Sequence, residues 1–77
     1  MGEKGRETHK RILNAIIEFI ETYNYPPAIR DISEMTGISI VYIHGCLKTL
    51  REQGLINYDD YVSRSIQVKG YKWIKVE

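Results

Sequence analysis

The sequence predicts a small α+β fold that is mostly α, with three helices followed by a C-terminal β-hairpin. Two observations predict it. Apolar residues recur at helical spacing in three separate stretches before residue 54, and each stretch is closed by Pro or Gly. After residue 54 the pattern changes to β-branched and aromatic residues in partial alternation, which is typical of strands.

The length and composition predict one globular domain. A chain of 77 residues buries only about 60% of its unfolded surface, so its core must be economical. With 43% apolar and 27% charged residues, the chain is globular rather than disordered. We predict a single domain over residues 1–77, with its core in about 7–68 and an extra strand or tail in 69–77.

Several features favour a cytoplasmic protein. No apolar run approaches the roughly 20 residues that span a bilayer, and the charged start is not a signal peptide, so no membrane partner is expected. Cys46 is the only cysteine and cannot form an internal disulfide, which indicates a reducing compartment. The net charge is +1, which argues against a general polycation, although basic residues are concentrated toward the two ends of the chain.

The first helix is predicted from about residue 7 or 8 to Tyr23. Its apolar residues cover one broad arc, and Thr8 is a candidate N-cap. The helix stops before Pro26 and Pro27, because proline lacks an amide proton and pushes the preceding residue out of helical geometry.

Two shorter helices are predicted next, at 28–36 and about 40–53. Gly37 fits the position after the first of them, where a positive φ is usually needed, and Gly54 gives a similar signal after the second. Ser39 is well placed as the N-cap of the later helix. Two helices joined by such a tight turn form a helix-turn-helix, whose second helix can lie in a DNA major groove.

Two strands are predicted at 55–58 and 62–68, separated by Asp59-Asp60-Tyr61. The tail at 71–76 also alternates, and it is either a third strand or an exposed edge that pairs with another chain. Three helices and a hairpin make a three-helix winged helix-turn-helix with a C-terminal β-hairpin wing.

The residues of these segments also match a known family. The run YPPAIRDISEMTGIS, then IHGCLKTLREQGLI, then SRSIQV resembles the N-terminal DNA-binding domain of LexA repressors over about residues 8–68. The resemblance implies a sequence-specific transcriptional repressor that binds double-stranded DNA. Its recognition helix, about 40–53, would lie in the major groove, with the wing at 55–68 on the backbone or in the minor groove.

The chain departs from the family in two respects. LexA repressors carry a second domain with a Ser and Lys catalytic dyad and an Ala-Gly bond that it cuts, whereas this chain contains no Ala-Gly pair. We therefore expect no peptidase domain and no self-cleavage. No enzyme activity is expected either, because the chain offers no paired activated groups and no volume for a pocket beside its small core. In addition, Ile40, Val41 and Tyr42 stand where the family tends to place small hydroxyl residues, after a turn that is one residue shorter.

The predicted DNA contacts lie on the outward stripe of the third helix, on the second helix and in the wing. They are Arg30, Ser39, Ile40, Val41, Tyr42, His44, Gly45, Lys48, Ser63 and Arg64. Polar side chains can bond base edges, whereas Ile40 and Val41 can contact a thymine methyl and favour A·T steps. By the resemblance, Arg64 contacts a phosphate or the minor groove, and the alternative is a solvated strand residue. Arg30, Lys10 and Arg11 are candidate phosphate contacts, helped by a helix dipole.

Two of these residues have a plain structural alternative. Gly45 costs about 1 kcal/mol relative to alanine inside a helix, so either close approach to a phosphate backbone favours it or it only relieves crowding. His44 is either a DNA contact or an ordinary surface histidine. No cofactor and no metal site are predicted, because neither His44 nor His9 lies beside a cluster of Cys or carboxylates. Cys46 falls on the core side of its helix, where it acts as a small apolar group.

The expected partner is double-stranded DNA, bound by two copies on a near-palindromic site because one domain of this charge binds weakly. No small-molecule substrate is evident. The competing hypothesis is a winged helix that binds proteins. In that case Ile40, Val41 and Tyr42 form one apolar patch, and Trp73 with Ile74 forms another.

Overall fold

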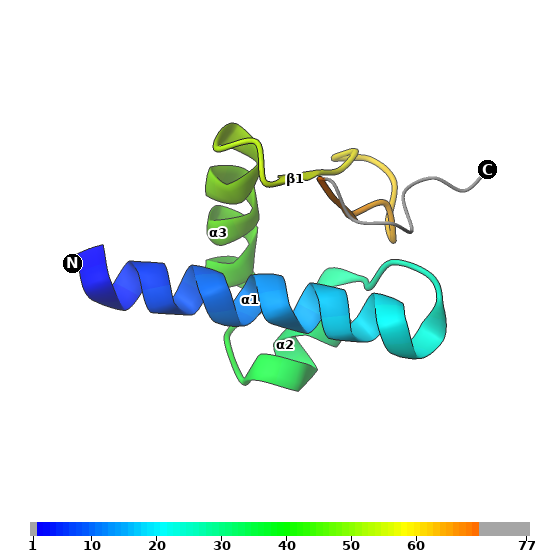
Figure 1. The fold of residues 1–77 in the computed structure, drawn as a ribbon, viewed down its shortest axis with the longest axis horizontal. Coiled ribbons are helices and arrows are strands. Elements are labelled where there is room, and N and C mark those ends of the chain that lie inside the picture. Colours follow the sequence, from blue (N-terminus) through cyan, green and yellow to red (C-terminus); the bar gives the residue numbers. More distant parts are fainter. Residues whose placement is uncertain (1, 70–77) are drawn as a thin grey trace.

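The computed structural model describes the backbone of residues 2–69 and the side chains of residues 7–69. Figure 1 shows a long first helix crossed by the third, with the second helix beside both and a hairpin extending from the end of the third. The helices are α1 (Gly2–Tyr23), α2 (Ile29–Thr36) and α3 (Ile40–Glu52), and the strands are β1 (Ile56–Asn57) and β2 (Gln67–Val68). The strands pair antiparallel, with Ile56 opposite Val68. The predicted fold of three helices and a hairpin wing is confirmed.

The first helix begins earlier than the sequence predicted. α1 starts at Gly2, so the prediction that Thr8 caps it is wrong, since Thr8 lies well inside the helix. Glu3 and Lys4 are both good helix formers. These residues extend the helix beyond the amphipathic stretch.

The two helices of the helix-turn-helix are bounded by the residues that the sequence predicted. Gly37 follows α2 with a φ of 77°, and its amide donates to the Ser33 carbonyl. The Ser39 hydroxyl accepts from the Tyr42 amide at 3.2 Å and so caps α3. Gly54 has a φ of 80° just after α3, in the left-handed region that side chains rarely adopt. The predicted boundaries at these glycines are confirmed.

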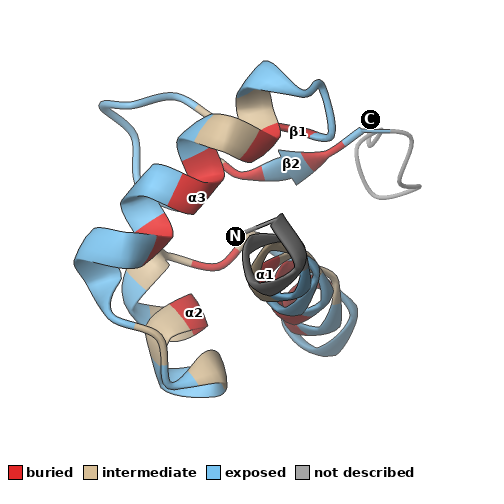
Figure 2. Cartoon of the chain, turned by 90° about the vertical axis from the view of Figure 1, so that its left-hand side faces the viewer, coloured by how far each residue is buried: buried red, intermediate tan, exposed pale blue. Residues whose placement is uncertain are grey.

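A single apolar cluster joins the elements. In Figure 2 the buried residues of α2, α3 and the hairpin are directed toward α1, while the outer side of α3 is exposed. The cluster takes residues from all three helices and both strands, namely Ile12, Ala15, Ile16, Ile20, Ile32, Ile43, Cys46, Leu47, Leu50, Ile56, Ile66 and Val68. This core fixes α3 by one side only, which leaves its other side available.

The strands of the wing are shorter than predicted, and the chain from 58 to 66 is a loop. Polar side chains replace the expected ladder there. The Ser65 hydroxyl accepts from the Asp59 amide at 2.9 Å, and the Val62 amide donates to the Asp59 carbonyl in a turn. The predicted third strand at 71–76 lies outside the described residues.

Candidate nucleic-acid interface

The outer side of α3 is open to solvent over its first two turns. Val41 is 81% exposed, Tyr42 51% and Ile40 43%, which is unusual for three consecutive apolar side chains. The predicted contact residues on this side are all exposed: Ser39, Ile40, Val41, Tyr42, His44, Gly45 and Lys48. These seven residues are called the outer side of α3 below.

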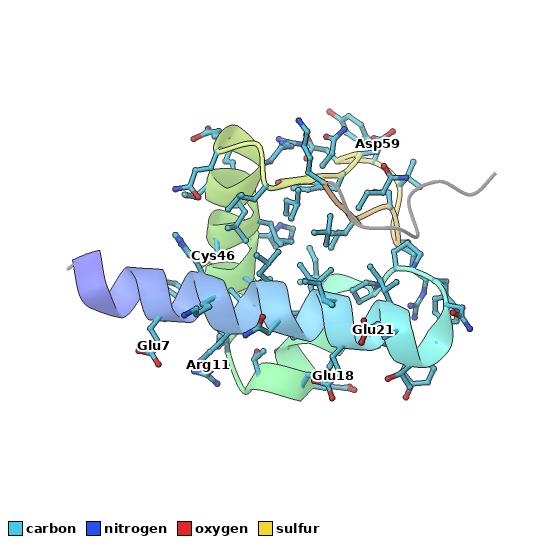
Figure 3. The ribbon with its side chains drawn as sticks, in the orientation of Figure 1. Glu7, Arg11, Glu18, Glu21, Cys46 and Asp59 are labelled. Carbon is cyan, nitrogen blue, oxygen red and sulfur yellow. The ribbon has the colours of Figure 1, made fainter. Side chains whose placement is uncertain are left out.

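Hydrogen bonds in the turn before α3 fix the direction in which this helix leaves α2. The Thr36 hydroxyl donates to the Ile32 carbonyl at 2.7 Å and accepts from the Ile38 amide at 3.2 Å. The Ser33 hydroxyl donates to the Ile38 carbonyl at 2.7 Å. In addition, the Arg11 guanidinium of α1 donates to the Thr36 carbonyl at 2.6 Å, on the side of α1 seen in Figure 3. The turn is therefore held by side chains of α1 and α2.

A hollow of about 530 Å³ separates α3 from the wing. It is lined on one side by α3 and on the other by the wing, through His44, Gly45, Lys48, Arg51, Tyr58, Asp60 and Tyr61. A Cβ added to Gly45 would meet no heavy atom within 4 Å among the residues that the structure describes. No described residue would be crowded by a side chain at position 45, so the alternative that Gly45 only relieves crowding is wrong for these residues.

The wing is stiffened by its own polar groups. Its tip, residues 61–63, is exposed, and the Tyr61 side chain is 96% exposed. The Asp59 carboxylate accepts from the Tyr61 amide at 3.0 Å, and Figure 3 places Asp59 in the part of the wing away from α1. Asp60 pairs with the Arg51 guanidinium at 3.3 Å. Asp59 and Asp60 carry negative charge that would repel a phosphate, but each is bonded to another group of the protein.

Arg51 holds the other end of this loop. Its guanidinium donates to the Tyr58 carbonyl at 3.2 Å and lies 4.1 Å from the centre of the Tyr58 ring. Sequence analysis missed Arg51, Tyr58 and Tyr61 as residues of this surface. A basic residue in the last turn of a helix, followed closely by a hairpin with an aromatic tip, was the signal available.

Arg64 is engaged within the protein. Its guanidinium pairs with the Asp31 carboxylate at 3.0 Å and donates to the Pro26 carbonyl at 3.2 Å. It also lies 5.1 Å from the ring centre of Tyr25 and 5.8 Å from that of Phe19. The DNA contact expected of Arg64 stays a prediction, as does that of Ser63, which is exposed one residue earlier, and that of Arg30, which is exposed near the start of α2.

The remaining reactive groups of residues 7–69 do not form a second kind of site. Cys46 is buried, and burial raises the pKa of its thiol. Among the described residues, no group of His, Cys, Asp and Glu could hold a metal ion. Between residues 2 and 69 there is also no helix of the length and apolarity needed to cross a membrane.

A helix-turn-helix whose second helix is uncovered on its outer side and flanked by a β-hairpin defines a winged helix-turn-helix module. Comparison with known families identifies which one. The model of the LexA DNA binding domain matches residues 6–65, so the chain belongs to this family.

The chain is also similar to curated LexA repressors. It is 38% identical over 69 residues to that of Acetivibrio thermocellus, an alignment that covers 88% of this chain and 32% of the relative. It is 37% identical over 67 residues to that of Staphylococcus aureus strain Newman, covering 82% of this chain and 32% of the relative. A LexA repressor of Desulforamulus reducens is 37% identical over 60 residues, covering 77% and 28%. The chain thus spans about a third of the length of these relatives.

Proposed function

We propose that this chain is the sequence-specific DNA-binding domain of a LexA-like transcriptional repressor. α3 would lie in the major groove of double-stranded DNA, with the wing along the adjacent backbone or minor groove. The observation that carries the proposal is the uncovered outer side of α3 beside an open hollow, in a chain of this family. Such a domain would act in the cytoplasm, together with the chromosome that it regulates.

The front of α3 supplies the groups that distinguish bases. The hydroxyls of Ser39 and Tyr42 and the imidazole of His44 can form hydrogen bonds with base edges in the major groove. Ile40 and Val41 offer methyl groups instead, and an apolar contact of this kind fits the methyl group of thymine. We therefore expect the bound sequence to contain A·T steps opposite the first turn of α3.

Other residues would hold the backbone without distinguishing bases. Lys48 is exposed and lines the hollow next to Gly45, where the missing side chain lets a phosphate approach the helix closely. Arg30 and Ser63 are exposed on α2 and at the wing tip, where each can contact a phosphate. These contacts set the register of α3 in the groove.

Two copies on a near-palindromic site would give the affinity that a repressor needs. The chain has a net charge of only +1, so a single copy gains little from general attraction to DNA. Two half-sites spaced by about one helical turn, roughly 34 Å, would place two recognition helices on the same side of the duplex.

The second candidate function is protein binding through the apolar start of α3. The exposure of Ile40, Val41 and Tyr42 favours it, since contiguous exposed apolar side chains often mark an interface. Trp73 and Ile74, which were predicted to form a second apolar patch, lie outside the described residues. The family match favours DNA over this alternative.

A salt titration separates the two functions. The chain is titrated with a pool of random duplexes at two salt concentrations, and the bound duplexes are then selected and sequenced. A DNA-binding domain should bind with an affinity that falls steeply as salt rises, because bound phosphates release counterions. The selected duplexes should share one motif rich in A·T steps. An absence of binding at low salt would overturn the proposal, and binding without a shared motif would overturn its sequence specificity.

A further inference from the structure

The wing carries an arginine that forms an ion pair with an acid of the same chain. Arg64 reaches back across the fold to an acid on α2 and to a carbonyl 38 residues earlier in the chain, at Pro26. Its left-handed backbone, with a φ of 58°, is uncommon for a residue with a side chain. This conformation aims the side chain toward α2 and persists because several contacts hold it.

The acid that receives Arg64 already has a task at the start of α2. The Asp31 carboxylate accepts from the Ala28 amide at 2.9 Å and so satisfies one of the free donors at this helix end. The Asp31 side chain is 23% exposed and that of Arg64 is 44% exposed, so the ion pair is partly shielded from water. The same carboxylate oxygen therefore binds both the helix-turn-helix and the wing.

The rings of Phe19 and Tyr25 complete the site for the guanidinium. They come from the end of α1 and from the turn that follows it, and both lie within cation–π distance of Arg64. Arg64 thus contacts three parts of the fold: α1, the segment before α2 and α2 itself. A phosphate at this position would have to compete with a carboxylate, a carbonyl and two rings.

We propose that Arg64 is a positioning residue for DNA binding, which holds the wing against the helix-turn-helix through Asp31 and does not itself contact DNA. The pair sets the separation between the wing tip and α3, and with it the width of the hollow that the DNA backbone would enter. This inference rests on the proposed function, and it replaces the direct phosphate contact expected of Arg64 from the sequence.

The charge on Asp31 distinguishes positioning from direct contact. The variant Asp31→Asn keeps an oxygen that can accept from the Ala28 amide but loses the negative charge that holds Arg64. If Arg64 contacted a phosphate, removal of this competing acid would strengthen DNA binding. If Arg64 is a positioning residue, the same change weakens binding by about twofold to fivefold, the range of a partly exposed ion pair.

Glu34→Gln is the matched control. Glu34 is an exposed acid on the same helix, so its replacement removes the same charge and leaves the Arg64 pair intact. Its affinity for DNA should equal or slightly exceed that of the parent. Arg64→Gln should weaken binding at least as much as Asp31→Asn, because it also removes the contacts with the Pro26 carbonyl and the two rings. The double variant should bind no more weakly than Arg64→Gln alone, because the ion pair is already broken there.

The salt dependence of the affinity gives a second test. If Arg64 contacted a phosphate, the plot of log affinity against log salt would be less steep by about 0.9 for Arg64→Gln than for the parent. A positioning residue leaves this slope unchanged while the affinity falls. Stronger binding by Asp31→Asn, or a reduced slope in Arg64→Gln, would overturn the inference.

A measurement without DNA keeps the inference separate from the proposed function. Chymotrypsin cleavage after Tyr61, followed by mass spectrometry, reports how firmly the wing is held. We expect faster cleavage in Asp31→Asn and Arg64→Gln than in the parent, at a temperature where circular dichroism shows all variants folded, and no change in Glu34→Gln. Equal rates in all four proteins would overturn the inference, whether or not the chain binds DNA.

Discussion

The outer side of α3 and the wing border the same hollow, yet their polar groups are arranged in opposite ways. In the wing, Asp59 is bonded to the wing's own backbone, and Asp60 and Arg64 form ion pairs with α3 and α2. On α3, Lys48 is exposed and forms no ion pair with any described residue. Under the proposed function, α3 would supply charge and base contacts, whereas the wing would supply a preformed shape.

The largest difference is expected between substitutions on the two sides of α3, in their effect on the free energy of unfolding. Ile43 is fully buried, and Ile43→Ala should lower the free energy of unfolding by about 2–5 kcal/mol, because it removes apolar contacts and leaves a cavity. Val41→Ala, two residues earlier on the exposed side, should change it by less than about 0.5 kcal/mol. Urea unfolding followed by circular dichroism measures both, and similar losses would mean that the outer side is not free.

The charge on α3 is tested by Lys48→Ala. The variant should bind every duplex more weakly. The plot of log affinity against log salt should also become less steep by about 0.9, because one phosphate contact is lost. Lys69→Ala removes the same charge at the end of β2, away from the hollow, and should leave the slope unchanged. If both variants behaved alike, the charge on α3 would have no special role.

A substitution at Gly45 should change the stability of the protein and its DNA affinity in opposite directions. Gly45→Ala should raise the free energy of unfolding by about 0.5–1 kcal/mol, since alanine favours a helix and the added methyl group meets no described atom. The same methyl group should weaken DNA binding if a phosphate approaches there. Gly54→Ala is the contrasting variant, because at a φ of 80° it should lower stability by about 1 kcal/mol. Unchanged DNA affinity in Gly45→Ala would exclude a close approach.

The smallest effect is expected from the ion pair at the base of the wing. Arg51 is 29% exposed and Asp60 is 56% exposed, so solvent screens the pair, and Asp60→Asn should cost about 0.2–0.5 kcal/mol of stability. A double-mutant cycle with Arg51→Gln isolates this coupling from the contact between Arg51 and Tyr58. A coupling above about 1 kcal/mol would show that the wing depends on this charge as well as on hydrogen bonds.

The ends of the helices could be predicted because the signals that set them are local. Ser39 caps α3 through an amide three residues away, and Gly37 adopts its positive φ within the turn that it closes. The buried and exposed sides of α3 also followed from spacing alone. The start of α1 was misplaced, because amphipathic spacing marks the part of a helix that is buried and not the part that extends beyond the core.

The wing could not be predicted in the same detail. Its loop is held by pairs such as Arg64 with Asp31, whose members lie far apart in the chain and whose bonding depends on the completed fold. A β-branched run indicates a strand, but Ser65 and Asp59 form hydrogen bonds with each other where strand pairing was expected. For the same reason, the sequence indicated that Arg64 belongs near the site without indicating which way it points.

The lone thiol of Cys46 gives the protein a built-in reporter. It is 4% exposed on the inner side of the helix whose outer side would meet DNA. A thiol-specific reagent can reach it only when the core opens, so the labelling rate of the unmodified chain follows the opening of α3 under native conditions. Protection of this thiol by a duplex would link ligand occupancy to internal packing without an introduced dye.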